Sequence, residues 1–240
     1  MHDGHNLFLK EEAFAGNTWR TDDVINMLDK MNAIEEVIVV GIHPHDRMNE
    51  YTMPGYEDYG RFLVEKLKPL IDGKHRTLNG PTNTAAMESS LGGVVSFYIG
   101  WQEVFGKIAC LSSTFTYRDN LLDRVSTESK RKLRIYLDSG WPGDNYEPTG
   151  SMRDRLIWKG YRPDSERLYL LFPRLSTTRM RGLRVARFHS NSFSETFHGS
   201  QNRHDPGSGC LSCCSIICRP DSKGAYENIL SSCLEVRVVC

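Results

Sequence analysis

The stretch Asn83-Thr-Ala-Ala-Met-Glu-Ser-Ser90-Leu-Gly-Gly-Val-Val-Ser-Phe97 decides the fold that we predict for this chain. A short apolar run opens it and a longer apolar run closes it, with serines and glycines between the two. This order predicts a buried strand, a tight turn and the start of a buried helix. Ser90 lies at the apex of the turn, where a hydroxyl would stand clear of the backbone.

The residues around Ser90 come within one position of the pattern G-x-S-x-G, in which a strand-to-helix turn presents a serine nucleophile. Such a turn favours residues without a side chain two positions before and two positions after the serine. Gly92 meets the second requirement, whereas Glu88 brings a side chain and a negative charge to the first. A Ser-Leu-Gly-Gly run also opens packed helices, so the pattern leaves a purely structural role open.

The composition argues against a polyanionic partner and against a membrane segment. The 240 residues carry 30 basic and 30 acidic side chains. No apolar run reaches the length of about 18 residues that a membrane helix needs. The amino-terminal residues lack the basic and apolar regions of a signal peptide. We therefore expect a cytoplasmic protein that has no nucleic-acid partner and no membrane partner.

Strand patterns alternate with helix patterns over residues 1–173. The β-branched run at 37–42 is typical of a strand buried on both faces. Further strands are expected at 107–113, 133–138 and 167–172, and further helices at 19–31, 59–71, 119–131 and 152–159. The Gly- and Pro-rich stretch 139–149 is expected to be a loop. The alternation predicts an α/β fold in which helices cover both faces of a parallel sheet.

The character of the chain changes after Pro173. Acidic side chains outnumber basic ones before this point and basic ones predominate after it, and six of the seven cysteines lie at or beyond Cys210. We expect one domain at 1–173 and a low-periodicity, partly disordered tail at 174–240, with loop or disorder over 190–224. The tail cysteines could bind zinc, but their spacing matches no pair of zinc knuckles, so we expect free thiols, no metal and no cofactor.

Four ordered blocks of residues resemble the putative-esterase branch of the α/β-hydrolases, which includes enterochelin esterases, S-formylglutathione hydrolases and feruloyl esterases. The order and the spacing of the blocks carry the likeness, which covers roughly residues 1–173. The blocks are 2–8 (His-Asp-Gly-His-Asn-Leu-Phe), Arg47 with 50–52, 89–93, and 137–140 with 143–145.

The resemblance implies an α/β-hydrolase-like sheet and a serine carboxylesterase that hydrolyses a small-molecule ester or thioester through an acyl-enzyme. Ser90 matches the nucleophile. Asp144 matches the triad acid, with Asp138 as the second choice. The backbone N–H groups of Leu91 and His5 match the two donors of the oxyanion hole.

The chain departs from the family pattern at its start, at Glu88 and at the base. The strands that family members place before the His-Asp-Gly loop would precede Met1, so we expect the sheet to lack its first strands. The family histidine follows the last strand directly. Here the later candidates are His189, His198 and His204, and His189 is taken as the base because an apolar run precedes it. The alternative is a catalytically impaired protein that binds ligands at most, and the oligomeric state is left open.

Overall fold

The computed structural model describes residues 1–141, 143–163, 170–173, 214–218 and 234–238. The chain forms two compact units. Unit 1 contains residues 1, 3–43 and 180–240, and unit 2 contains residue 2 and residues 44–179.

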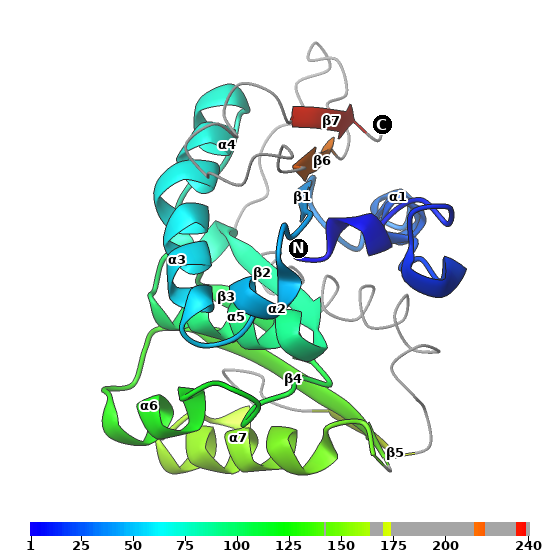
Figure 1. Ribbon diagram of the computed structural model, residues 1–240. Coiled ribbons are helices and arrows are strands. Elements are labelled where there is room, and N and C mark those ends of the chain that lie inside the picture. The colour runs from blue at the N-terminus through cyan, green and yellow to red at the C-terminus, as the bar shows by residue number, and fades with distance from the viewer. Residues whose placement is uncertain (142, 164–169, 174–213, 219–233, 239–240) are drawn as a thin grey trace. The chain divides into compact units, whose positions relative to one another are not determined.

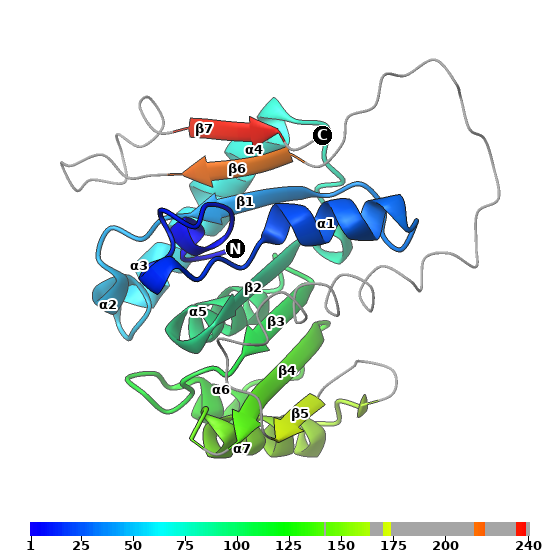
Figure 2. The same ribbon diagram turned by 90° about the vertical axis from the view of Figure 1, so that its right-hand side faces the viewer.

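Unit 2 is built on a parallel sheet of four strands (Figures 1 and 2). Its strands follow the chain in spatial order: β2 (Ala85–Ser89), β3 (Lys107–Leu111), β4 (Arg134–Trp141) and β5 (Leu170–Pro173). All five residues of β3 are buried, as expected for a strand covered on both faces. The structure thus confirms the parallel sheet predicted from the alternating patterns.

Helices flank this sheet. The helix α5 (Ser90–Trp101) packs on β2 and β3, and α7 (Tyr146–Trp158) packs on β4. The helix α6 (Leu121–Thr127) lies against α7, and α3 (Gly55–Phe62) lies against α5. A short helix α2 (Arg47–Glu50) precedes α3, and a five-residue π-helix (Leu63–Leu67) joins α3 to α4 (Lys68–Lys74).

Two of the predicted boundaries are wrong. The polar stretch 139–149 was expected to be a loop, but β4 extends to Trp141 and α7 already begins at Tyr146. Pro148 is the third residue of α7, and a proline in the first helical turn removes no hydrogen bond that the helix would make. The Gly- and Pro-rich composition was therefore a poor guide to this helix start.

Unit 1 contains the helix α1 (Thr21–Lys30), the strand β1 (Ile38–Ile42) and two 3-10 turns at Gly4–Asn6 and Phe14–Gly16. The tail supplies β6 (Cys214–Cys218), which pairs parallel with β1, and β7 (Leu234–Val238), which pairs antiparallel with β6. A strand at Cys214–Cys218 differs from the loop expected over 190–224. The domain boundary at residue 173 stays a prediction.

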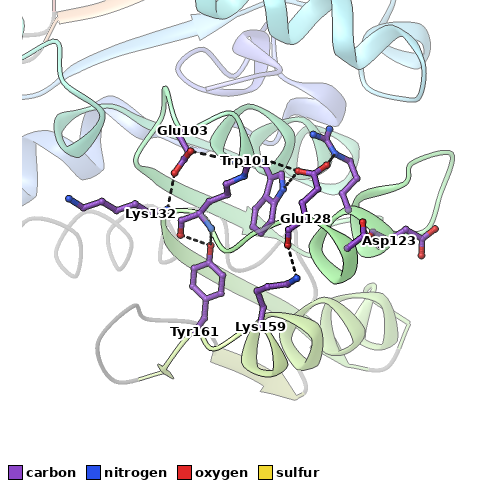
Figure 3. Close-up of polar contacts among 10 residues, drawn as sticks. Trp101, Glu103, Asp123, Glu128, Lys132, Lys159 and Tyr161 are labelled. Atoms are coloured by element: carbon purple, nitrogen blue, oxygen red, sulfur yellow. Dashed lines mark hydrogen bonds and ion pairs between the residues drawn. The ribbon is translucent and has the colours of Figure 1, made fainter.

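A polar network ties together the segments that lead into β3 and β4 in unit 2 (Figure 3). Glu128 is its centre. Its carboxylate accepts hydrogen bonds from Arg124 Nε (2.6 Å), Trp101 Nε1 (2.8 Å) and Arg131 Nη2 (3.0 Å), and its carbonyl oxygen accepts one from Lys159 Nζ (2.6 Å). The network joins the ends of α5, α6 and α7, on the amino side of the sheet.

None of the helices in the described ranges combines the length and the apolar character that crossing a bilayer requires.

Candidate active site

Ser90 lies at an abrupt reversal between a strand and a helix. Ser89, the last residue of β2, has extended backbone angles (φ −109°, ψ 163°), and α5 starts at the next residue. Ser90 itself has a φ of +56°, in the left-handed region that residues with a side chain rarely adopt. A strained residue of this kind persists only where the surrounding structure enforces it, and such residues cluster at functional sites.

The turn places backbone donors beside Ser90. The first amides of a helix have no carbonyl four residues earlier to bond with, and they carry the positive end of the helix dipole. Leu91 is the second residue of α5, so its N–H belongs to this group. The position of Leu91 therefore fits the role of an oxyanion donor that the sequence predicts for it.

Glycines allow close packing behind the turn. A Cβ added to Gly92 would lie 2.2 Å from Cγ of Glu88, and a Cβ added to Gly93 would lie 1.9 Å from Oγ of Ser113. Both distances are far below a van der Waals contact. Neither position can accept a side chain without a shift of its neighbours.

Glu88 is accommodated inside this packing. Its side chain is 1% exposed and runs alongside Gly92. Its Oε1 atom accepts a hydrogen bond from the backbone N–H of Ser89, at 3.0 Å. The strand-to-helix turn therefore forms although Glu88 occupies a position where the pattern expects glycine.

Asp144 lies on the loop between β4 and α7. Its Oδ2 atom accepts hydrogen bonds from Ser112 Oγ (2.9 Å) and from the backbone N–H of Gly140 (3.1 Å). Asp138, the second choice for the acid, lies within β4, is fully buried and accepts a hydrogen bond from the hydroxyl of Tyr136 at 3.1 Å. A half-buried carboxylate on a loop can meet a histidine from another segment, so the geometry favours Asp144 over Asp138.

The loop that follows β3 contacts two other segments: the turn at Ser89–Ser90 (the serine turn) and the loop between β4 and α7 that carries Asp144 (the acid loop). The backbone N–H of Thr114 donates to the carbonyl oxygen of Ser90 at 3.3 Å, while Ser112 contacts Asp144. The three loops follow β2, β3 and β4, so they share the carboxyl edge of one sheet. Ser112 was not among the predicted site residues. It lies within the strand predicted at 107–113, whereas β3 ends at Leu111, so no local signal marked it as a loop residue.

Two predicted site residues are not brought to Ser90 by these observations. His5 belongs to unit 1, where its ring lies 5.6 Å from the ring of His43, whereas Ser90 belongs to unit 2. His189, like the other candidate bases His198 and His204, lies outside the described residues. The second oxyanion donor and the catalytic base therefore stay predictions.

Cys110 is not a competing nucleophile in this region. It lies in β3 and is fully buried, and burial together with the nearby Asp138 carboxylate raises the pKa of its thiol well above the usual value. Such a thiol stays protonated and unreactive. Within the ranges that the structure describes, no three side chains of His, Cys, Asp or Glu gather in a way that could hold a metal ion.

A serine turn after one strand of a parallel sheet, with a carboxylate loop two strands along, is the arrangement of the α/β-hydrolase class. The chain belongs to the putative esterase family, whose model matches residues 4–162. This match confirms the resemblance drawn from the four sequence blocks. No curated protein sequence matches the chain.

Solved esterase structures share the fold. Enterochelin esterase from Shigella flexneri is 18% identical, with a TM-score of 0.59, and the match covers 71% of this chain and 46% of that one. A ferulic acid esterase is 13% identical with a TM-score of 0.59, covering 72% and 76% of the two chains. An IroE-like serine hydrolase from Shewanella oneidensis is 16% identical with a TM-score of 0.61, covering 81% and 69%. The match thus spans about half the length of the Shigella enzyme.

Proposed function

We propose that this protein is a serine carboxylesterase that acts on a small-molecule ester or thioester. The observation that carries the proposal is the left-handed backbone of Ser90 between β2 and α5, the geometry of a nucleophile elbow. Membership of an esterase family supports ester hydrolysis as the general class of reaction.

In the proposed reaction, the Ser90 oxygen attacks the ester carbonyl carbon while a histidine, His189, accepts the hydroxyl proton. The backbone N–H groups of Leu91 and His5 hold the oxyanion, and Asp144 orients the histidine. The histidine returns its proton to the leaving alcohol or thiol, which leaves an acyl group on Ser90. Water, activated by the same histidine, then releases the acid and restores the serine. No cofactor takes part.

Two structural neighbours suggest which substrates to test first. One is named a ferulic acid esterase, and the other is an enterobactin esterase from Shigella flexneri whose structure was determined with 2,3-dihydroxy-N-benzoyl-serine. An aromatic acid appears in the name of the first enzyme, and an aromatic acyl group appears in the molecule that was present with the second. We therefore propose esters of hydroxylated aromatic acids as the first substrate class. A cytoplasmic location and the absence of a nucleic-acid or membrane partner stay predictions.

The test is covalent labelling of the full chain with a fluorophosphonate probe. We expect one phosphonyl group per chain, attached to Ser90 in the peptide map, and loss of labelling in Ser90→Ala. The matched control is Ser89→Ala at the neighbouring serine, which should still be labelled at Ser90. Labelling that persists in Ser90→Ala at the wild-type rate would contradict the proposal.

The second candidate is an impaired esterase-like protein that binds ligands at most, and the buried Glu88 favours it. A carboxylate two residues from Ser90 opposes the negative charge that develops on the substrate oxygen. Glu88→Gln keeps the shape and removes the charge, so labelling should be faster by about tenfold, equivalent to about 1.4 kcal/mol. An unchanged rate would show that Glu88 does not oppose the reaction. A folded wild-type chain without any labelling would favour the second candidate.

A further inference from the structure

Ser112 is the first residue after β3, and its backbone is held in an uncommon conformation. Its φ is +44° and its residue is 1% exposed. Its N–H donates to the carbonyl oxygen of Asp138 at 2.7 Å, which extends the pairing of β3 with β4 by one step. The position of Ser112 is therefore fixed by the sheet and not by the loop that follows.

Two consecutive residues of the acid loop contact Ser112. Its hydroxyl donates to Oδ2 of Asp144 at 2.9 Å, and its carbonyl oxygen accepts a hydrogen bond from Nδ2 of Asn145 at 2.7 Å. Asn145 is the N-cap residue of α7, yet its side chain makes no capping bond to that helix. The amide is used to bind Ser112, so the acid loop is attached to the end of β3 at two points.

The hydrogen bonds on Oδ2 determine how the Asp144 carboxylate is rotated. One donor, the Ser112 hydroxyl, comes from the end of β3, and the other, the Gly140 N–H, comes from β4. Two donors from two rigid segments converge on one oxygen, and this fixes the direction of both carboxylate oxygens. Hydrogen bonds to an ionised carboxylate are also among the stronger ones in proteins.

We propose that Ser112 is a positioning residue that holds the Asp144 carboxylate in the orientation a triad acid requires. The inference rests on the proposed esterase function. Ser112 acts through Asp144 and does not itself touch the substrate. The loop that contains Ser112 also bonds the carbonyl oxygen of Ser90 through Thr114, so one loop sets the acid relative to the serine turn.

The test is a double-mutant cycle that measures the fluorophosphonate labelling rate and, with an ester substrate, kcat and KM. Ser112→Ala should lower the labelling rate and kcat by about tenfold to a hundredfold with KM within about twofold, because a small misplacement of a catalytic group costs that much. In an Asp144→Asn background, Ser112→Ala should change the rate by less than about twofold, because the two residues act as one unit. An equal loss in both backgrounds would overturn the proposal.

Two further variants separate the hydroxyl from the backbone. Ser112→Gly removes the hydroxyl and relieves the left-handed φ, and it should be as slow as Ser112→Ala. Thr127→Ala removes a hydroxyl that bonds only the carbonyl of Asp123 within α6, and it should label at the wild-type rate. A wild-type rate in Ser112→Gly would show that the hydroxyl is not what matters.

Crystal structures of the wild type and Ser112→Ala distinguish failure of this inference from failure of the esterase proposal. A folded wild-type chain without labelling would refute the esterase proposal, and the structures would then decide the positioning alone. We expect the Asp144 carboxylate to rotate away from its wild-type orientation in Ser112→Ala. A carboxylate that keeps its orientation without the hydroxyl would overturn the role of Ser112.

Discussion

The side chain of Glu88 occupies the space that a side chain on Gly92 would need. The ideal Cβ position of Gly92 is 2.2 Å from Cγ and 2.9 Å from Cβ of Glu88. The two residues are therefore complementary in volume across the strand-to-helix turn. Where the serine pattern expects two residues without a side chain, this chain has one large residue packed against one glycine.

Gly92→Ala should destabilise the protein by about 2 kcal/mol, the usual cost of overpacking a closed site. The colliding atom is Cγ of Glu88, which lies near the backbone and cannot swing away as the end of a long side chain would. Urea denaturation measures the loss. A free energy of unfolding equal to the wild type would contradict the packing described.

The double variant Glu88→Gly/Gly92→Ala is the matched rescue, because it restores the space beside position 92 and should recover much of the lost stability. Gly150→Ala is the control for the substitution itself. Gly150 lies within α7 with no atom within 4 Å of the added Cβ, so alanine should raise helix stability there by about 1 kcal/mol.

Ser90→Gly should raise the free energy of unfolding and at the same time abolish labelling by the fluorophosphonate probe. A residue with a side chain pays about 1 kcal/mol for a left-handed backbone, and glycine does not. Unfolding free energy and fluorophosphonate labelling, measured on the same preparation, check both halves of this prediction.

Ser89→Gly is the control for Ser90→Gly, because Ser89 has an ordinary extended φ of −109°. Glycine at that position only adds freedom to the unfolded chain and should lower stability by about 0.5–1 kcal/mol. If both glycine variants lose stability alike, the backbone of Ser90 is not strained.

Glu128→Gln should lower the free energy of unfolding at neutral pH, and this loss should become smaller in acid. Burial alone would raise the pKa of the Glu128 carboxyl, but hydrogen bonds from two arginines and from Trp101 outweigh burial and lower the pKa to about 2. A carboxyl group whose pKa is lower in the folded state than in the unfolded state stabilises the fold at pH values above its unfolded pKa. This stabilisation is lost as the pH falls through the folded pKa.

The difference in unfolding free energy between wild type and Glu128→Gln should therefore be smaller at about pH 3.5 than at about pH 7. Urea denaturation at both pH values measures it. Glu65→Gln, at an exposed position in the π-helical segment, is the matched control for replacing a glutamate by glutamine. A pH-independent difference for Glu128→Gln would mean that the carboxylate charge is not stabilised by this network.

The sheet could be predicted because local patterns carried the information. Apolar and β-branched runs marked β1, β3 and β4, and the apolar run after Ser90 marked α5. Ser90 could be named because it lies at the apex of a predicted strand-to-helix turn. Asp144 was named from the family resemblance, which implies a triad acid on the loop after the strand at 133–138. These predictions needed no knowledge of which side chains meet.

The parts that could not be predicted depend on contacts between distant segments. Nothing local shows that Gly92 makes room for Glu88, or that the hydroxyl of Ser112 is aimed at a carboxylate on another loop. The strand β6 lies in a tail without apolar periodicity, and its assignment depends on pairing with β1. The start of α7 was hidden because Pro148 was read as part of a loop when it lies in a first helical turn.

The pairing of β1 with β6 has a consequence for how the polypeptide folds during synthesis. Unit 2 is almost entirely one continuous segment, whereas in unit 1 the backbone of Ile38 pairs in register with that of Cys214. Contacts between residues so far apart along a chain form slowly, and during translation they must wait for the later partner to emerge. Cys214 must therefore be synthesised before β1 can pair with β6, and by then all four strands of the unit 2 sheet have already been made.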